Sequence, residues 1–267
     1  MKNNIRFELS FKNISQLENK LNFCKLNNIK NINIPCKGLI KKEFFNSTIK
    51  YISKNFNEFN VTYHYSLYHQ YSKNKDNSYK DFLDFVKNSH INRNYEILLV
   101  SGSHKKKNFD SVDVLAFLKK EKNLKVKLCI AYNPYLKKYY NISSERERLE
   151  RKISTGLINS IWFQYGTDIK VLKYELTYLK KIAKDEKLNL FGSLFIPSKQ
   201  FIARFKFRPW KEVYISKKCL YALDNFFAFT SDLVSFYKNN HITPVIESDF
   251  SSSEKLDSVY SFLENEK

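Results

Sequence analysis

Residues 145–166 read ERERLERKISTGLINSIWFQYG, and this stretch decides the fold because it predicts a helix, a tight turn and a buried strand in direct succession. Ser143 or Ser144 is placed to cap the start of the helix, and Gly156 supplies the left-handed residue that ends it. Residues 158–163 are apolar or aromatic almost throughout, which is typical of a parallel strand covered on both faces. The stretch therefore predicts one repeat of an α/β fold.

The same alternation continues on both sides of this stretch. We expect further strands at 5–11, 31–35, 61–66, 95–101, 125–132, 188–195 and 243–247, and further helices at 13–27, 41–56, 79–87, 111–121, 168–185, 198–207, 218–239 and 252–264. No GxGxxG motif follows the first strand, which argues against a dinucleotide-binding open sheet. The sequence therefore predicts an α/β fold of the TIM type, a (β/α)8 barrel that forms a single domain over residues 1–267.

Composition sets the broad class of the protein. A hydrophobic share of 43%, with 23 Phe and 18 Tyr, is enough for a sizeable core. No apolar run reaches the length of a membrane span, and residues 1–10 lack the core of a signal peptide, so we expect a cytoplasmic protein with no membrane partner. The four cysteines show no CxxC spacing, which predicts reduced, mostly buried thiols and neither a metal site nor disulfides.

The formal net charge of +19 invites a nucleic-acid interpretation. Composition offers a second explanation, because Lys outnumbers Arg 39 to 7 and the lysines are dispersed along the chain. Arg is the better residue for binding phosphates and bases, and it is scarce here. We therefore expect no specific nucleic-acid partner and only weak binding that salt abolishes.

The pairs Arg151-Lys152 and Gln164-Tyr165, with the glycine turn between them, resemble methylenetetrahydrofolate reductases. The resemblance extends thinly over nearly the whole chain. It implies a flavin-dependent barrel that reduces methylenetetrahydrofolate to methyltetrahydrofolate with NADH or NADPH, in one-carbon metabolism and methionine biosynthesis. It leaves the oligomeric state open, including a homo-oligomer.

The resemblance also implies which residues handle the folate. The segment Phe7-Glu8-Leu9 matches a family strand whose glutamate is the general acid, so the resemblance implies that Glu8 gives a proton to a folate nitrogen. A rim glutamate paired with a lysine is the alternative. Gln164 and Gln200 match glutamines that hold the folate, and an amide suits a pterin edge because it both donates and accepts.

Nine residues are assigned to FAD by the resemblance: His64, Ser101, Gly102, Ser103, Tyr132, Glu145, Arg148, Arg151 and Lys152. His64 and Tyr132 match flavin-side positions, and those from Glu145 onward match contacts of the adenine-ribose-pyrophosphate part. Residues 101–103 replace the family's Arg-Gly-Asp, which removes a phosphate partner and a charge beside the flavin. We therefore expect weaker FAD binding than in typical members. A flavin-free folate-binding barrel and, from charge alone, a nucleic-acid-binding protein are the alternatives.

Overall fold

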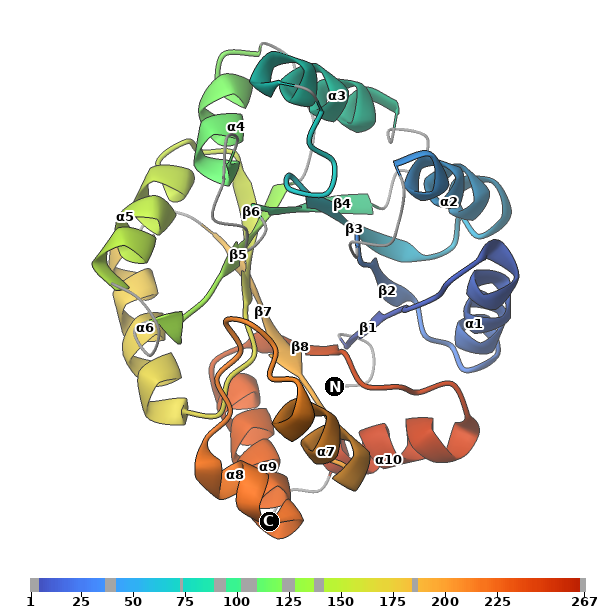
Figure 1. Ribbon diagram of the computed structural model, residues 1–267, viewed down its shortest axis with the longest axis vertical. Helices are drawn as coiled ribbons and strands as arrows, with labels where there is room; N and C mark the ends of the chain where they lie inside the picture. The colour runs from blue at the N-terminus through green and yellow to red at the C-terminus, as the bar shows by residue number, and fades with distance from the viewer. Residues whose placement is uncertain are drawn as a thin grey trace. The chain divides into compact units, whose positions relative to one another are not determined.

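The computed structural model describes residues 5–36, 42–72, 74–88, 95–101, 110–121, 128–136, 142–183 and 187–264. Within these ranges eight strands follow one another in chain order around a closed parallel barrel (Figure 1). They are β1 (Arg6–Glu8), β2 (Asn31–Ile34), β3 (Asn60–Ser66), β4 (Tyr95–Val100), β5 (Leu128–Tyr132), β6 (Ile158–Phe163), β7 (Asn189–Leu194) and β8 (Ile242–Ile246). The predicted (β/α)8 barrel is confirmed.

At least one helix follows every strand. The helices are α1 (Ile14–Leu26), α2 (Lys42–Asn55), α3 (Lys75–Asn88), α4 (Ser111–Leu118), α5 (Ile142–Ile153), α6 (Ile169–Ile182), α7 (Lys199–Phe207), α8 (Lys217–Tyr221), α9 (Leu223–Asn239) and α10 (Ser253–Glu264). Side-chain caps explain several starts: Asn13, Asp168 and Ser198 each accept a hydrogen bond from a backbone amide three residues ahead.

The helix of the opening stretch differs from its prediction at one end. Helix α5 begins at Ile142, so Ser143 and Ser144 lie inside its first turn and do not precede it as caps. At the other end Gly156 has a φ of 70°, as the predicted left-handed turn requires.

The chain forms two compact units, each built from separate segments. Unit 1 comprises Met1–Arg6, Tyr132–Glu150 and Ser160–Lys267, and unit 2 comprises Phe7–Ala131 and Arg151–Asn159. The single domain over residues 1–267 stays a prediction.

In unit 2 the alternation along β3 shows which side of the sheet faces the helices. The ring of Tyr63 lies 6.4 Å from that of Phe45 in α2, and the ring of Tyr65 lies 4.7 Å from that of Phe82 in α3. Successive side chains of a strand point to opposite sides. The remaining residues of the strand, Thr62, His64 and Ser66, therefore lie on the inner face of the barrel.

In unit 1 the glycine of β7 marks the helix side in the same way. A Cβ atom on Gly192 would lie 2.3 Å from Cζ of Tyr237, so the ring of α9 occupies the space that a side chain would need. Phe191 and Ser193, the neighbours of Gly192, point to the inner face.

Two further predictions concern the whole chain. Cys24, Cys36, Cys129 and Cys219 are all buried, as expected of structural thiols. Among the residues that the structure describes, no helix is long and apolar enough to cross a membrane.

Candidate functional site

The inner face of unit 2 carries a row of polar side chains. Glu8, the last residue of β1, is in register with Asn33, and Asn33 is in register with Thr62. Thr62 lies beside Glu96, and its Oγ1 donates to Oε2 of Glu96 at 3.3 Å. Asn33 and Thr62 are fully buried, whereas Glu8 is half-buried at the carboxyl end of its strand. Because residues in register share one side of a sheet, Glu8 points to the inner face.

Two residues of the predicted flavin site also belong to unit 2. His64 lies on the inner face of β3, two residues beyond Thr62, and is half-buried. The Ser101 hydroxyl lies 2.8 Å from the Ser111 hydroxyl and accepts a hydrogen bond from the Ser111 amide at 3.0 Å. Ser101 thus holds the start of α4. Its two predicted companions, Gly102 and Ser103, lie outside the described residues.

Deep in unit 1, the inner face is filled by a cation and two aromatic rings. Trp162 and Phe191 stack with their centroids 4.6 Å apart. The Arg6 guanidinium lies 5.8 Å from the centroid of Trp162 and 5.7 Å from that of Phe191, which is a favourable cation–π distance. Gln164 comes two residues after Trp162, just past the carboxyl end of β6, and is half-buried. It is the predicted folate residue nearest to this cluster in sequence.

A carboxylate that the sequence interpretation had not singled out lies at the carboxyl end of β8. Glu247 directly follows the strand, and its backbone amide donates to the carbonyl of Leu194 at 3.0 Å, which extends the β7–β8 pairing by one step. Its Oε1 accepts a hydrogen bond from the hydroxyl of Ser193. Ser193 is buried and on the inner face, so the Glu247 carboxylate lies there too.

A tyrosine on the helix side of the sheet holds Ser193, the donor to Glu247, in place. Tyr237 of α9 is buried and donates its hydroxyl to the backbone carbonyl of Ser193 at 3.0 Å. Burial and then the negative charge of Glu247 raise the pKa of Tyr237, which keeps the phenol neutral. The Ser193 backbone and side chain are therefore both held, and the Glu247 carboxylate has a fixed donor.

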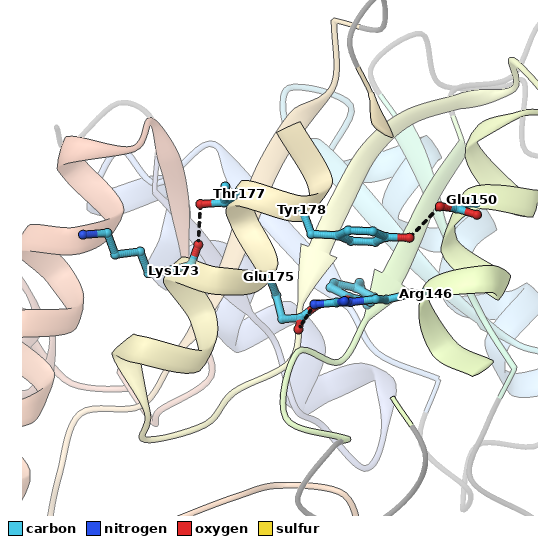
Figure 2. A network of polar contacts seen from close by, with 7 residues as sticks. Arg146, Glu150, Lys173, Glu175, Thr177 and Tyr178 are labelled. Carbon is cyan, nitrogen blue, oxygen red and sulfur yellow. Dashed lines mark hydrogen bonds and ion pairs between the residues drawn. The ribbon is translucent and has the colours of Figure 1, made fainter. Parts of the chain in front are cut away.

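Tyr132 points to the helix side of unit 1 and not to the inner face. Its hydroxyl donates to Oε2 of Glu175 in α6 at 2.6 Å. Arg146 of α5 grips the same carboxylate with two bonds, Nε to Oε2 at 3.0 Å and Nη2 to Oε1 at 2.7 Å (Figure 2). The Arg146 guanidinium also lies 4.3 Å from the ring centroid of Tyr178, whose hydroxyl donates to Glu150 at 2.6 Å.

This network is closed within the protein. Glu175 is 2% exposed, and its hydrogen bonds raise the pKa of Arg146 above the ordinary value, so the guanidinium stays charged. Burial and then Glu175 raise the pKa of Tyr132. The hydroxyl predicted to lie beside a flavin is thus committed to a buried ion pair.

The residues of α5 that the resemblance assigns to FAD fall into different environments. In unit 1, Nε of Arg148 donates to Oε2 of Glu145 at 3.3 Å, so these two form an intrahelical pair. In unit 2, Arg151 is exposed, whereas Lys152 is only 4% exposed. Both lie in the last turn of α5, which leads into the amino end of β6.

Gln200 lies in the first turn of α7 and is exposed. The helix that carries it packs an aromatic cluster, in which Trp210 lies 5.2 Å from Phe195 and 5.4 Å from Phe201 between ring centroids. Phe205 is buried and belongs to the same cluster, whereas Trp210 is exposed.

A metal centre has no support in the described part of the chain, which contains no cluster of three or more His, Cys, Asp or Glu side chains. The functional candidates that sequence reasoning missed are Ser193 and Glu247. One signal was available, because an acid directly after an apolar strand stands at the end where barrel sites are built.

No protein-family model matches the chain, and no curated protein matches it in sequence. Solved structures do match it in fold. A protein from Clostridium thermocellum that binds two copies of 5-methyl-5,6,7,8-tetrahydrofolic acid superposes with a TM-score of 0.59 over 97% of this chain and 93% of that one, at 11% identity. The catalytic domain of a hyperthermophilic chitinase from Pyrococcus furiosus gives a TM-score of 0.51 over 99% and 97%, also at 11% identity.

These comparisons show the fold. At 11% identity they carry no residue assignments, and the same fold is shared by a folate-binding protein and a chitinase domain.

Proposed function

We propose that the protein binds a reduced folate at the carboxyl ends of its barrel strands and acts on the folate's one-carbon group. The observation that carries this proposal is the place of Glu8, a half-buried carboxyl on the inner face at the carboxyl end of β1. Active sites of TIM barrels lie at that end. The fold likeness to a methyltetrahydrofolate-binding protein supports the choice of ligand.

The finer proposal is reduction of methylenetetrahydrofolate to methyltetrahydrofolate. In methylenetetrahydrofolate the methylene carbon bridges N5 and N10. Glu8 gives its proton to N10, the bond from the carbon to N10 breaks with its electron pair going to N10, and the N5 lone pair forms the iminium. Proton transfer of this kind is a task for a positioned carboxyl. Hydride that originates from NADH or NADPH then reduces the iminium to the methyl group.

The residues carried over for FAD, the hydride carrier of the family, fit it only in part. The Tyr132 hydroxyl is bound to Glu175, the Ser101 hydroxyl holds α4, and Lys152 is buried. His64 and Arg151 remain half-buried or exposed. We therefore route no step through a flavin and propose that FAD, if it is the carrier, binds weakly.

Titration calorimetry with 5-methyltetrahydrofolate and a visible spectrum after addition of FAD test these two levels separately. We expect folate binding in the micromolar range or tighter, and flavin absorbance that is retained only at excess FAD. The absence of folate binding would remove the proposed function. Folate binding without any bound flavin would leave the flavin-free barrel as the better assignment.

The role of Glu8 is tested by Glu8→Gln, which keeps size and hydrogen bonding but has no proton to give. Loss of a general acid lowers a rate by about a hundredfold or more. We expect NAD(P)H-dependent reduction of methylenetetrahydrofolate to fall by that factor, with binding of 5-methyltetrahydrofolate nearly unchanged. Glu96→Gln, in the same polar row, is the matched control. Equal losses in both variants would mean that the row is structural.

A further inference from the structure

The carboxylate of Glu247 is the feature that the proposed function has not used. It lies at the carboxyl end of β8, on the inner face of unit 1, and Ser193 Oγ donates to one of its oxygens. Its position is narrowly defined, since the backbone amide of Glu247 pairs with Leu194 and Ser193 is held by Tyr237. A carboxylate held in this way presents acceptors in a fixed direction.

A reduced folate offers an edge that matches such a group. Its 2-amino-4-oxo ring carries N3–H and the 2-amino group side by side, so two donors point the same way at the spacing of two carboxylate oxygens. An ionised carboxylate is an acceptor only, with two oxygens, whereas an amide would turn one of its own donors toward the edge. Hydrogen bonds to a charged acceptor are also the stronger kind.

We propose that Glu247 is the residue that recognises this donor edge of the folate ring, with Ser193 as the positioning residue that holds the carboxylate. The inference rests on the proposed function, because it names a residue that recognises the folate of that proposal. It assigns the two donors of the ring to Glu247. Neither Glu247 nor Ser193 was among the residues that the family resemblance supplied.

Its alternative is a carboxylate that merely fastens β8 to β7 through Ser193. The two differ in what they predict about the ligand. If Glu247 only joins the two strands, its removal changes folate affinity only by lowering protein stability. The affinity then does not depend on Glu247 contacting the donors of the ring. A recognising carboxylate makes affinity depend on the 2-amino group, and that dependence disappears when the carboxylate is removed.

The experiment is a cycle between protein and ligand. The dissociation constants of 5-methyltetrahydrofolate and of its analogue lacking the 2-amino group are measured for the wild type and for Glu247→Gln. The wild type should bind the analogue about ten- to a hundredfold more weakly, which is the range for a lost hydrogen bond to a charged acceptor. Glu247→Gln should bind the parent folate more weakly by a similar factor and should distinguish the two ligands by less than about threefold.

The matched control is Asp249→Asn, which removes a negative charge from the same segment at a residue that pairs with Lys255 on the surface. It should leave both affinities and their ratio unchanged. Ser193→Ala is the second variant and should reduce the ratio while keeping the carboxylate.

The outcomes separate the two proposals. If folate binds and Glu247→Gln still discriminates against the analogue as the wild type does, the assignment of Glu247 is overturned while the proposed function stands. If the wild type binds no reduced folate, the proposed function fails and this assignment fails with it. Should Glu247→Gln not fold, a ratio unaltered in Ser193→Ala would count against the proposal.

Discussion

Unit 1 contains two carboxylates that each accept a hydrogen bond from a hydroxyl on a barrel strand, and they have opposite fates. Glu175 receives the Tyr132 hydroxyl on the helix side and is gripped there twice by Arg146. Glu247 receives the hydroxyl of Ser193 on the inner face, at the carboxyl end of the strands. The first is buried in a guanidinium pair, whereas the second has a neutral hydroxyl as its described donor.

The role of a glutamate in this barrel therefore depends on the side of the sheet to which it points. A buried carboxylate satisfied by a guanidinium and a phenol has its hydrogen-bonding capacity filled by the protein, so it contributes to stability and orientation. A carboxylate at the strand ends lies where barrels place their ligands. Chemistry alone does not separate Glu175 from Glu247, but the side of the sheet does.

The largest effect is expected from Glu175→Gln. It removes the negative charge that Arg146 pairs with, and the Arg146 side chain is 21% exposed, so a half-buried cation loses its partner. Breaking such a pair costs about 3–5 kcal/mol, and the lower end applies to a partly exposed partner. The free energy of unfolding from urea titration measures the loss.

The comparison supplies the controls for this variant. Glu247→Gln keeps an acceptor for the Ser193 hydroxyl, so it should change the unfolding free energy by less than about 1 kcal/mol. Glu150→Gln removes the exposed partner of Tyr178 from the same network and should also stay below about 1 kcal/mol. If Glu175→Gln and Glu247→Gln destabilise equally, the division between the two carboxylates is wrong.

A smaller effect is expected from Gly192→Ala. This substitution adds a side chain on the helix side of β7, next to Ser193, which donates to the Glu247 carboxylate. The new Cβ would lie 2.3 Å from Cζ of Tyr237, a ring that is buried and cannot turn away freely. Overpacking of this kind costs about 1–3 kcal/mol. Because Ser193 is the next residue, we expect folate affinity to fall together with the melting temperature.

Gly156→Ala is the matched control for that variant. Its φ of 70° strains an alanine, but no atom lies within 4 Å of the new Cβ. A left-handed alanine costs about 1–2 kcal/mol. Stability should drop with folate affinity unchanged. A loss of affinity in both variants would show that affinity merely follows stability.

The smallest effect is expected from Asp249→Asn and depends on pH. Burial opposes ionisation of Asp249, but hydrogen bonds from Lys255 and Ser251 outweigh it and lower its pKa to about 2. The folded pKa is therefore below the ordinary value of 3.8. The stabilisation is present above that value and is lost as pH falls toward 2.

Because Asp249 is about half exposed, solvent screening keeps the gain below about 1 kcal/mol. Wild type and Asp249→Asn should thus differ slightly in unfolding free energy at pH 7 and converge near pH 2. A difference that grows on acidification would contradict the assigned direction.

Much of the fold was predictable because it depends on local patterns. The largely apolar and aromatic stretch 158–163 and the glycine after α5 specified a strand and a turn that the structure places as expected. The predicted helix over 218–239 is wrong in continuity, since Ala222 is extended, with φ −135° and ψ 139°, and separates α8 from α9. No glycine or proline marks that break, so the periodicity of apolar residues predicts one continuous helix there.

The site was predictable only in part, because its residues come from separate strands. The family resemblance supplied Glu8 as a candidate, and alternation along β3 explains why His64 points inward. Tyr132 also ends a strand but points to the helices, and its partner Glu175 lies on the apolar stripe of α6, where an acid signals a buried partner. A sequence shows that such a residue needs a partner without showing which one, since Arg146 comes from another helix.

The stack of Arg6, Trp162 and Phe191 also bears on how this protein can change over time. Phe191 and Ser193 lie two residues apart on one strand, and the first packs while the second holds a carboxylate. The deep layer can therefore keep the barrel folded while the residues at the strand ends vary. A new ligand specificity can arise by substitutions at the carboxyl ends of β7 and β8 that leave the packing of Arg6, Trp162 and Phe191 unchanged.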